Sequence, residues 1–256
     1  MKPSPAPDLK KRLYGLIGKD ISYSFSRTYF TEKFENLGLN QCSYVNFDLQ
    51  SMDEFRTIVI PQLHSIGGLN VTIPYKEQII QYLDEVDQEA LRIGAVNTIK
   101  VFPDGKLKGY NTDVYGFEAS ISKMLLPHHT SALVLGTGGA SKAVAFVLEK
   151  LGLTHRLVSR KKSGQGFLTY AELDRVAMES HKVIVNCTPL GTFPEVDRKP
   201  DLPYEHLGSD HLLFDLIYNP ERTSFLLEGE KRGSKILNGR EMLEKQADRA
   251  WDIWNS

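Results

Sequence analysis

The fold of this chain is decided by residues 132–142, which read ALVLGTGGASK. The apolar run Ala132–Leu135 predicts a short buried strand, and Lys142–Leu151 predicts the helix that follows it. Between the two, Gly136 and Gly138 permit a tight turn and a close approach of the backbone to a pyrophosphate. The unpaired N–H groups at the start of the helix, and its positive dipole end, would face that anion. The segment therefore predicts a dinucleotide-binding turn.

This turn departs from the GxGxxG pattern at the third glycine, where Ser141 stands after Ala140. A plain strand-to-helix connection is the alternative interpretation. The apolar strand before the turn and the uninterrupted helix after it favour the nucleotide turn, because the glycine pattern binds phosphates in that structural context.

Apolar segments alternate with helical ones through the second half of the chain. Beyond Ala132–Leu135, strands are predicted at Arg156–Ser159, Lys182–Cys187, Leu212–Ile217 and Lys235–Leu237, and a second helix at Tyr170–Glu179. Short apolar strands with helices between them imply a parallel sheet that is covered on both faces.

The first half also has an α/β pattern. Strands are predicted at Leu13–Ile17, Ser43–Phe47 and Leu69–Ile73, and helices at Thr28–Leu37 and at Met52–Gln62, the latter broken near Pro61. A hairpin of Ala95–Val101 and Lys106–Tyr110 around Pro103-Asp104-Gly105 follows. We expect Pro74 to open a helix after the third strand. The last helix, Glu241–Trp254, is amphipathic, and we expect it to pack back on the first domain.

Composition argues against several classes of protein. The chain has 256 residues, 41% hydrophobic and 25% charged, and its net charge of −1 gives no electrostatic reason to expect nucleic acid or an anionic membrane as a partner. No apolar run reaches the roughly 20 residues that span a bilayer, and a secretory signal is not seen. Cys42 and Cys187 lack CxxC spacing, which argues against a disulfide framework and a metal site. We expect a cytoplasmic protein that binds no metal.

The end of the second strand indicates which dinucleotide is bound. About 20 residues beyond the glycines, an NAD site usually presents an acid to the ribose 2′-hydroxyl. Here the chain has Ser159, Arg160, Lys161 and Lys162, with no carboxylate nearby. A guanidinium and an ammonium suit a 2′-phosphate, so we predict NADP(H). A solvated basic turn is the alternative.

Two ionisable residues could handle a proton. Lys76 ends the segment Asn70–Lys76 and is expected in the first turn of a helix, where the dipole disfavours an ammonium. Asp113 ends Gly109–Asp113 and could hold that ammonium in position. The alternatives are a surface lysine and a helix N-cap formed by Thr112 or Asp113. Beside a dinucleotide site, such a pair describes an oxidoreductase that acts on a hydroxyl or a ketone.

Polar side chains also occur on otherwise apolar elements, at Ser24, Ser26, Asn70, Thr72, Asn97 and Gln246. Asn70 and Thr72 would share one face of a strand, and Ser24 and Ser26 would share one side of their loop if it is extended. Each also has an ordinary interpretation as a cap, a turn residue or a helix flank. Together they suit a small polyhydroxylated acid.

Eight ordered motifs between Leu13 and Trp254 resemble the shikimate dehydrogenase family. They are Gly15–Gly18 with Ser24 and Ser26, Asn70–Lys76, Gly94–Thr98, Asn111–Asp113, Gly136–Ala143, Asn186–Gly191, Asp215–Pro220, and Gly239 with Met242–Ala247. The resemblance implies two α/β domains with a cleft between them: a substrate domain of residues 1–110 with 240–256, and a Rossmann-like NADP-binding domain of residues 111–239. The final helix would return to the first domain.

The resemblance also implies a role for each matching position. Lys76 and Asp113 would be the catalytic pair. Substrate would be bound through its carboxylate by Ser24, Ser26 and Tyr218, and through its ring hydroxyls by Asn70, Thr72, Asn97 and Gln246. NADP(H) would be bound by Gly136, Thr137, Gly138, Gly139, Ala140, Ser159, Arg160 and Lys161, extending to Lys162, with Leu216 and Gly239 at the nicotinamide end.

Two segments depart from the family pattern. The family usually has His and Pro where this chain has Tyr23 and Arg27, which affects the loop around the two serines. Its adenine-side motif is usually Asn-Arg-Thr, of which Ser159-Arg160-Lys161 keeps only the arginine.

The activity implied by the resemblance is reversible reduction of 3-dehydroshikimate to shikimate by NADPH, in chorismate and aromatic amino acid biosynthesis. The expected partner is this small-molecule substrate, with neither nucleic acid nor membrane, and both a monomer and a homodimer stay open. One alternative is a quinate/shikimate dehydrogenase that uses NAD, which would favour an acid after the second strand. Another is a non-catalytic NADPH-binding regulator, against which Lys76, Asp113 and Gln246 speak.

Overall fold

The computed structural model describes residues 12–22, 24–161 and 165–256, which form two compact units. The first unit extends to Thr112 and also contains Ala250–Ser256, whereas the second is Asp113–Arg249. The last helix, α7 (Arg240–Asn255), begins in the second unit and ends in the first. Residues 240–249 thus group with the second unit, whereas the sequence-based boundary places them with the first domain.

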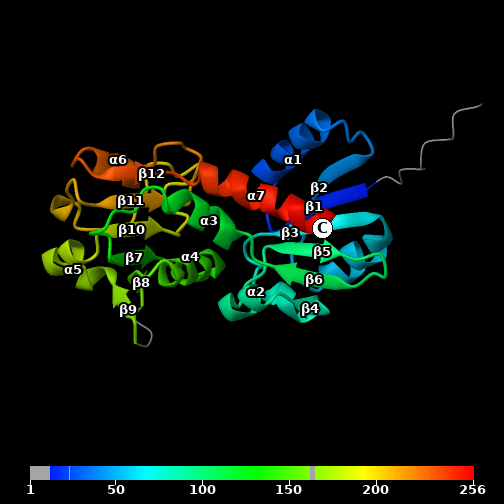
Figure 1. The fold of residues 1–256 in the computed structure, drawn as a ribbon, viewed down its shortest axis with the longest axis horizontal. Coiled ribbons are helices and arrows are strands. Elements are labelled where there is room, and N and C mark those ends of the chain that lie inside the picture. Colours follow the sequence, from blue (N-terminus) through cyan, green and yellow to red (C-terminus); the bar gives the residue numbers. More distant parts are fainter. Residues whose placement is uncertain (1–11, 23, 162–164) are drawn as a thin grey trace, which may run out of the picture. The chain divides into compact units, whose positions relative to one another are not determined.

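The second unit is built on a six-stranded parallel sheet in the order β12-β11-β10-β7-β8-β9 (Figure 1). The strands are β7 (Ser131–Leu135), β8 (Thr154–Ser159), β9 (Phe167–Thr169), β10 (Val183–Asn186), β11 (Leu212–Asp215) and β12 (Lys235–Leu237). This is the strand order of a dinucleotide-binding sheet. From β7 the chain adds strands first on one side, as β8 and β9, and then on the other, as β10, β11 and β12, so the strand order reverses between β7 and β10. Ligands of such sheets bind at the carboxyl ends of the strands beside this reversal.

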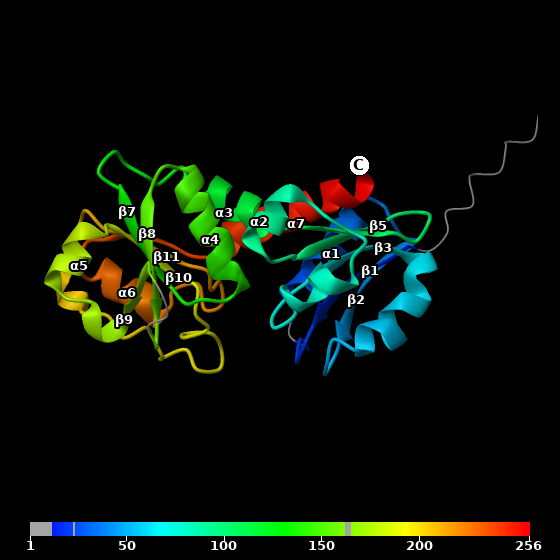
Figure 2. The ribbon, with the colours of Figure 1, turned by 90° about the horizontal axis from the view of Figure 1, so that it is seen from below.

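Helices cover both faces of this sheet. In Figure 2, α3 (Asp113–Ile121) and α4 (Gly139–Lys150) lie on one side, and α5 (Arg175–Ser180) and α6 (Ser224–Glu230) on the other. The central strands β7, β10 and β11 are buried along nearly their whole length, with Leu133, Ile184 and Leu213 completely inaccessible to solvent. Burial on both faces explains their continuous apolar sequences. The predicted parallel sheet with two covered faces is confirmed.

The single helix predicted at Tyr170–Glu179 is wrong, because the chain forms two separate helical segments there. Its first residues form the 3₁₀-helix η4 (Tyr170–Glu172), and α5 starts anew after Asp174. The Asp174 carboxylate accepts a hydrogen bond from the backbone N–H of Ala177 at 2.8 Å, which caps α5 and ends the preceding turn.

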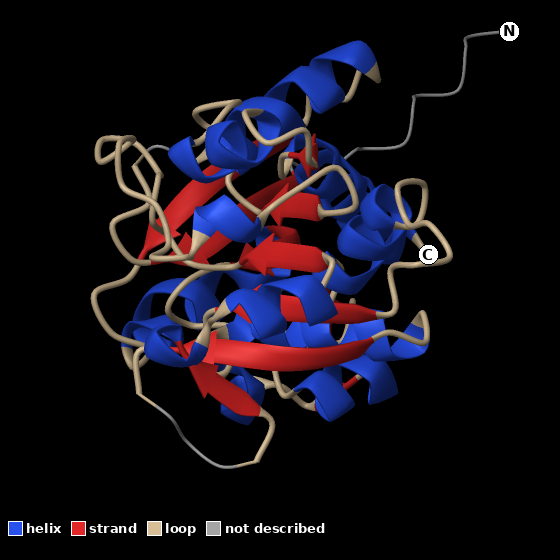
Figure 3. Ribbon diagram, turned by 90° about the vertical axis from the view of Figure 1, so that its left-hand side faces the viewer, coloured by secondary structure: helices blue, strands red, loops and turns tan. Residues whose placement is uncertain are grey.

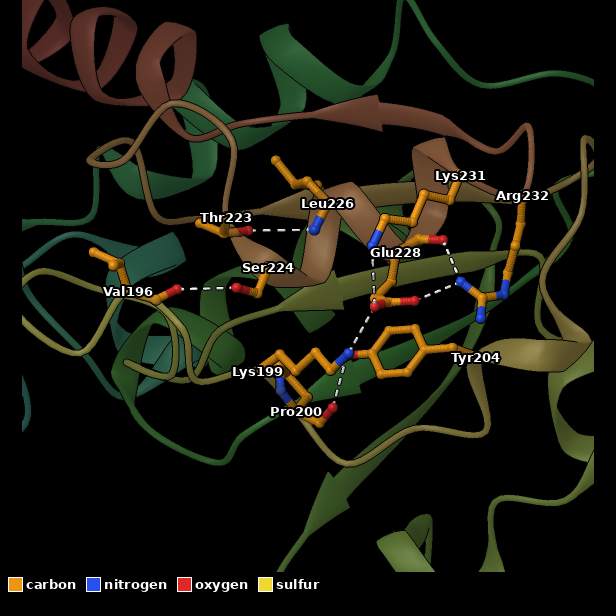
Figure 4. Close-up of polar contacts among 10 residues, drawn as sticks. All are labelled: Val196, Lys199, Pro200, Tyr204, Thr223, Ser224, Leu226, Glu228, Lys231 and Arg232. Carbon is orange, nitrogen blue, oxygen red and sulfur yellow. Dashed lines mark hydrogen bonds and ion pairs between the residues drawn. The ribbon is translucent and has the colours of Figure 1, made fainter.

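The segment between β10 and β11, which contains η5 (Tyr204–His206), is held on α6 by a cluster around Glu228 (Figure 4). The Glu228 carboxylate accepts hydrogen bonds from Lys199, at 2.8 Å, and from Arg232, while Lys231 lies 3.7 Å away. The Lys199 ammonium also lies 4.8 Å from the centre of the Tyr204 ring. Lys199 belongs to the segment between β10 and β11, whereas Lys231 and Arg232 directly follow α6. The Glu228 carboxylate therefore joins this segment to α6.

The first unit has a mixed six-stranded sheet in the order β2-β1-β3-β5-β6-β4. Its strands are β1 (Arg12–Gly18), β2 (Cys42–Asp48), β3 (Ile66–Val71), β4 (Glu85–Val86), β5 (Thr98–Val101) and β6 (Leu107–Tyr110). The first three strands are parallel, and β5 pairs antiparallel with both β3 and β6. The predicted hairpin is therefore formed by β5 and β6. Figure 3 distinguishes the strands, helices and loops of each unit.

An aromatic cluster covers one face of this sheet. Trp254, from the end of α7, packs on Tyr14 and on Phe30 of α1 (Phe25–Asn36), with ring centres 5.0 and 5.1 Å apart. The indole N–H of Trp254 donates to the carbonyl of Ile99 at 3.0 Å. At Gly68 a Cβ atom would lie 2.2 Å from the Trp254 ring, so only glycine leaves room for it. The predicted return of the last helix to the first domain is confirmed.

The opposite face carries an aliphatic core that includes Ile17, Leu69, Ile79 and Ile99, all fully buried. It is covered by α2 (Gln88–Ile93), the π-helical turn η1 (Phe55–Val59) and the 3₁₀-helices η2 (Ile60–Ser65) and η3 (Gln78–Tyr82). The sequence predicts a helix over Met52–Gln62 that is broken near Pro61, and the chain forms η1 and η2 there. It changes helix type beside Pro61, which has no N–H to donate, so the predicted break is confirmed.

The helix expected to start at Pro74 is also wrong. Residues 72–75 form a turn in which the N–H of Tyr75 donates to the carbonyl of Thr72 at 2.9 Å. The buried Tyr75 hydroxyl donates to the carbonyl of Leu49 at 2.6 Å, which anchors the turn. Lys76 therefore lies in a turn before η3 and not in the first turn of a helix, so the dipole argument for it does not hold.

Across the described ranges, no helix combines the length and the apolar content needed to cross a membrane.

Candidate active site

A buried hydrogen-bonded network joins β2, β3 and β5 in the first unit. The Asn70 side chain accepts a hydrogen bond from the Tyr44 hydroxyl at 2.8 Å and donates to the Thr98 hydroxyl at 3.2 Å. All three residues are buried. Asn70 is thus held by partners on both sides, as a buried amide requires.

Asn97 connects this network to the end of the first unit. Its side-chain carbonyl accepts hydrogen bonds from the backbone N–H of Thr112 at 2.7 Å and from the hydroxyls of Thr112 and Thr98 at 3.1 Å. Asn111 donates its amide to the carbonyl of Ala95 at 2.9 Å. These bonds fix the chain directly before Asp113.

Ser24 and Ser26 lie at the start of α1, which begins at Phe25 and not at Thr28 as predicted. The condition for placing both hydroxyls on one side, an extended loop, is not met, because Ser24 is the N-cap and Ser26 already lies in the first turn. The Ser24 Oγ atom is buried and has no hydrogen-bond partner among the described residues. A buried hydroxyl of this kind, at a helix N-terminus, suits the carboxylate of a ligand. Tyr23 lies outside the described residues.

Ser26 also contacts the buried network. Burial raises the pKa of the Tyr44 hydroxyl well above its usual value, and a hydrogen bond with Ser26 lowers it in part. Tyr44 therefore links Ser26 to Asn70, two residues for which the sequence predicts different parts of one substrate.

Thr72 and Lys76 follow the carboxyl end of β3, and both are half-buried. The backbone N–H of Thr72 donates to the carbonyl of Ile17 at 2.8 Å, and the carbonyl of Lys76 accepts from the N–H of Val96 at 2.7 Å. Thr72 lies one residue beyond the strand that it was expected to share with Asn70. The turn carrying Lys76 is tied to the segment that carries Asn97.

In the second unit, the predicted nucleotide turn connects β7 to α4, at the reversal of strand order. Gly136 has φ +108°, which favours glycine, and a Cβ there would lie 3.4 Å from Cys187 and Thr188 after β10. Gly138 is the N-cap of α4, and no described atom lies within 4 Å of where its Cβ would stand. This open, side-chain-free helix start fits a pyrophosphate.

The remaining residues of the turn surround this helix start. Thr137 is exposed, while Gly139 and Ala140 are half-buried in the first turn of α4. Ser141, in place of the third glycine, is buried and donates its hydroxyl to the carbonyl of Gly138 at 2.6 Å.

Two cations directly follow β8, the strand beside β7. Arg160 and Lys161 are both exposed there, and the Ser159 hydroxyl donates to the carbonyl of Lys161. Lys162 lies outside the described residues. A pair of exposed cations with no acid beside it in the sequence fits a phosphate on the adenine ribose better than a free 2′-hydroxyl.

Leu216 and Gly239 lie against each other after β11 and β12. A Cβ at Gly239 would stand 2.0 Å from the carbonyl oxygen of Leu216, so the position accepts only glycine. The N–H of Gly239 donates to the carbonyl of Ile217 at 3.1 Å. The two positions predicted at the nicotinamide end are therefore neighbours.

Asp113, Tyr218 and Gln246 also belong to the second unit. Asp113 is buried as the first residue of α3. Burial, with a contribution from the carboxylates of Asp215 and Asp113, raises the pKa of the Cys187 thiol well above its usual value. Burial likewise raises the pKa of the Tyr218 hydroxyl. Gln246 is half-buried on α7 and donates to the carbonyl of Leu243 at 3.1 Å.

The structure thus groups the predicted residues in two sets. The first unit contains Ser24, Ser26, Asn70, Thr72, Lys76 and Asn97, and the second contains Asp113, Tyr218, Gln246 and the nucleotide-binding positions. The pairing of Lys76 with Asp113 stays a prediction.

Sequence reasoning gave no role to two groups of polar residues. Tyr44 and Thr98 complete the network around Asn70, and Asn186 and Asp215 form another at the ends of β10 and β11. For Asn186 and Asp215 the available signal was a polar residue at the end of an otherwise apolar strand, which marks the ligand-binding edge of a parallel sheet. Tyr44, inside β2, and Thr98, at the start of β5, carry no such signal.

Known proteins are similar to this chain over most of its length. The model of the shikimate dehydrogenase substrate binding domain matches residues 16–99. A protein of Clostridium beijerinckii named shikimate dehydrogenase (NADP(+)) is 39% identical over 94% of this chain and 91% of its own length. The chain belongs to the shikimate dehydrogenase family.

Solved structures of shikimate dehydrogenases and of a quinate dehydrogenase share the fold. The shikimate 5-dehydrogenase of Thermus thermophilus, in complex with NADP(H) and shikimate, is 31% identical with a TM-score of 0.83, covering 95% of this chain and 93% of that one. The quinate dehydrogenase of Corynebacterium glutamicum, in complex with NAD, is 25% identical with a TM-score of 0.85, covering 96% and 94%. The expected two-domain α/β architecture of the family is confirmed.

Proposed function

We propose that this chain catalyses the reversible, NADPH-dependent reduction of 3-dehydroshikimate to shikimate, a step of chorismate and aromatic amino acid biosynthesis. The observation that carries the proposal is the similarity, along nearly the whole chain, to relatives named shikimate dehydrogenase (NADP(+)). The local geometry of each unit supports it.

Substrate binding is proposed to use the polar network of the first unit. The Ser24 hydroxyl, which has no partner within the described part of the chain, and the neighbouring Ser26 lie at the start of α1. They would bind the substrate carboxylate together with Tyr218. The ring hydroxyls would be bound by Asn70, Thr72, Asn97 and Gln246. The amide of Asn70 is already oriented by Tyr44 and Thr98, which lowers the entropic cost of binding.

Lys76 and Asp113 are proposed as the proton-transfer pair. NADPH, when bound, supplies the hydride. The Lys76 ammonium would donate a proton to the oxygen of the ring ketone as it becomes a hydroxyl, and Asp113 would hold the ammonium in place. General acid catalysis of this kind typically contributes 10²- to 10⁴-fold to the rate.

Cofactor choice is proposed to depend on Arg160 and Lys161. The C. glutamicum quinate dehydrogenase, solved with NAD, makes quinate oxidation with NAD the competing assignment. The two exposed cations after β8 favour NADP, because an NAD site usually has an acid at that place.

A turnover assay at the absorbance band of the reduced nicotinamide tests the proposal. Shikimate and quinate are each offered with NADP+ and with NAD+, and we expect shikimate with NADP+ to give the highest kcat/KM. Turnover of quinate with NAD+ at the higher kcat/KM would favour the competing assignment, and no turnover of either acid would favour a non-catalytic regulator.

The role of Lys76 is tested by Lys76→Met. We expect kcat to fall by roughly 10²- to 10⁴-fold with a smaller change in KM. Lys106→Met is the matched control, because Lys106 is exposed in the β5–β6 turn and pairs only loosely with Asp104, at 3.6 Å. A kcat near that of the control would remove the assignment.

We also propose a cytosolic location, which the free thiols of Cys42 and Cys187 support. Light scattering would decide between the monomer and the homodimer.

A further inference from the structure

The carboxylate of Asp215 lies at the centre of the second unit's ligand-binding edge. Asp215 is the last residue of β11 and is fully buried. One carboxylate oxygen accepts hydrogen bonds from the Asn186 amide and from the backbone N–H of Ile217, both at 3.0 Å. The other accepts from the Thr223 hydroxyl at 2.6 Å. The group is satisfied by donors from three separate segments.

One branch of these contacts leads to the pyrophosphate turn. An ionised carboxylate only accepts hydrogen bonds, so the Asn186 side chain must present its NH₂ group to Asp215 and its oxygen to the other side. That oxygen accepts from the N–H and the hydroxyl of Thr188, at 3.0 and 2.7 Å. Thr188 and the adjoining Cys187 backbone lie beside Gly136, 3.4 Å from where its Cβ would stand. The contacts of Asn186 thereby fix the residues that pack against the nucleotide turn, Cys187 and Thr188.

The other branch leads to the nicotinamide end. The bond between the Ile217 N–H and Asp215 sets the backbone turn that carries Leu216. The Leu216 carbonyl packs on Gly239, whose N–H donates to the carbonyl of Ile217. A displacement of Asp215 would therefore move both ends of the proposed cofactor site.

We propose that Asp215 is a positioning residue for the cofactor, acting through Asn186 and Thr188. It does not touch the cofactor itself. Its ionised carboxylate selects one orientation of the Asn186 amide, and that orientation holds Thr188 against the nucleotide turn. This inference rests on the proposed function only in that it takes the β7–α4 turn as a dinucleotide site.

The test measures NADPH binding without turnover, by titrating the fluorescence of the reduced nicotinamide. Thr188→Val keeps the shape of the side chain and removes its hydroxyl, and we expect the Kd for NADPH to rise roughly three- to tenfold, the value of one hydrogen bond. Thr188→Ser restores the hydroxyl, so its Kd should return to within about twofold of wild type. Shikimate binding to the free enzyme should be unchanged in both.

Asp215→Asn tests the origin of the effect. An amide at this position can turn its NH₂ group toward Asn186 and so releases the constraint on that side chain. We expect a similar rise in the Kd for NADPH in Asp215→Asn. The double variant with Thr188→Val should have a Kd no higher than that of the single variant that binds NADPH more weakly, because both substitutions act on one contact.

Ser234→Ala is the matched control. The Ser234 hydroxyl is also buried and donates to the carbonyl of Gly208 at 2.9 Å, but it lies at the amino end of β12, the opposite edge of the same sheet. Its loss should lower the Tm and leave the Kd for NADPH unchanged. The proposal is overturned if Thr188→Val lowers the Tm as this control does and leaves the Kd for NADPH at the wild-type value. Because no reaction is followed, a failure of the shikimate assay would leave this result intact.

Discussion

Asp215 also makes the stability of the protein depend on pH. Burial raises its pKa from 3.8 to about 6, although hydrogen bonds from Thr223, Ile217 and Asn186 lower it in part. The pKa of Asp215 is higher in the folded protein than in the unfolded chain, so the protonated carboxyl stabilises the fold. This contribution to the free energy of unfolding is complete below about pH 4 and is lost as the pH rises through about 6. The shift, from 3.8 to about 6, corresponds to about 3 kcal/mol.

We predict that Asp215→Asn removes this decline, because the amide does not ionise. Urea unfolding at about pH 4.5 and about pH 7 gives the free energy of unfolding of both proteins, and the difference between the two pH values should be smaller in the variant. If the two proteins lose the same free energy over this range, the buried carboxyl is not the group responsible.

At the scale of single residues, the sequence predicts which residues have a functional chemistry better than it predicts what surrounds them in the fold. Gly136 and Gly138 were assigned to a phosphate-binding turn, and the positive φ of one and the open space at the other fit that role. Ser24 and Ser26 were selected as polar residues, but their place at the start of α1 depends on packing of Phe30 and Phe34, which a local pattern does not reveal. Asn186 and Asp215 lie within the predicted strands Lys182–Cys187 and Leu212–Ile217, and the sequence gives them no role, because their contact joins residues from two different strands.

At the scale of elements, the cluster in Figure 4 connects a long segment to a helix. Hydrogen bonds, first from Lys199 and then from Arg232, lower the pKa of Glu228 to about 2. Since the folded value lies below the usual one, the stabilisation is present above about pH 4.5 and is lost as the pH falls toward 2.

We predict that Glu228→Gln lowers the free energy of unfolding at neutral pH by about 1 to 2 kcal/mol, because hydrogen bonds to a charged group are lost. The matched control is Glu179→Gln, which breaks the exposed pair of Glu179 with Arg175 on α5 and should cost less than about 0.5 kcal/mol. Chemical unfolding at neutral pH compares the two, and equal losses would show that the Glu228 cluster is no more than a surface ion pair.

The elements themselves divide by how local their causes are. The parallel strands of the second unit were predicted because burial on both faces imposes a continuous apolar run. The turn at Thr72–Tyr75 was mistaken for a helix start, because Pro74 suits both and the deciding bond, from the Tyr75 hydroxyl to Leu49, is long-range. Likewise β4 and β9 were missed, because each is short and depends on a single neighbouring strand.

At the scale of the whole molecule, the end of the chain completes the core of the first unit. Trp254 is 3% exposed and contacts Tyr14, Phe30 and the carbonyl of Ile99. We predict that Trp254→Ala lowers the free energy of unfolding by about 3 to 5 kcal/mol, since it leaves a large cavity against Gly68.

The exposed end of α7 offers the control for this prediction. Asn255→Ala removes an exposed side chain whose amide donates to the carbonyl of Trp251, at 2.7 Å, on the surface of the same helix. Thermal unfolding should show a large decrease in Tm for Trp254→Ala and little change for Asn255→Ala. A similar, small decrease in both would mean that the last turn of α7 does not belong to the core.

The position of Trp254 has a consequence for biosynthesis of the protein. A ribosome delivers Gly68 and its neighbouring strands long before the indole that fills the space above them, with the entire second unit made in between. The nascent first unit therefore has an uncovered aromatic face, which Trp254 can cover only after the residues of α7 have left the exit tunnel.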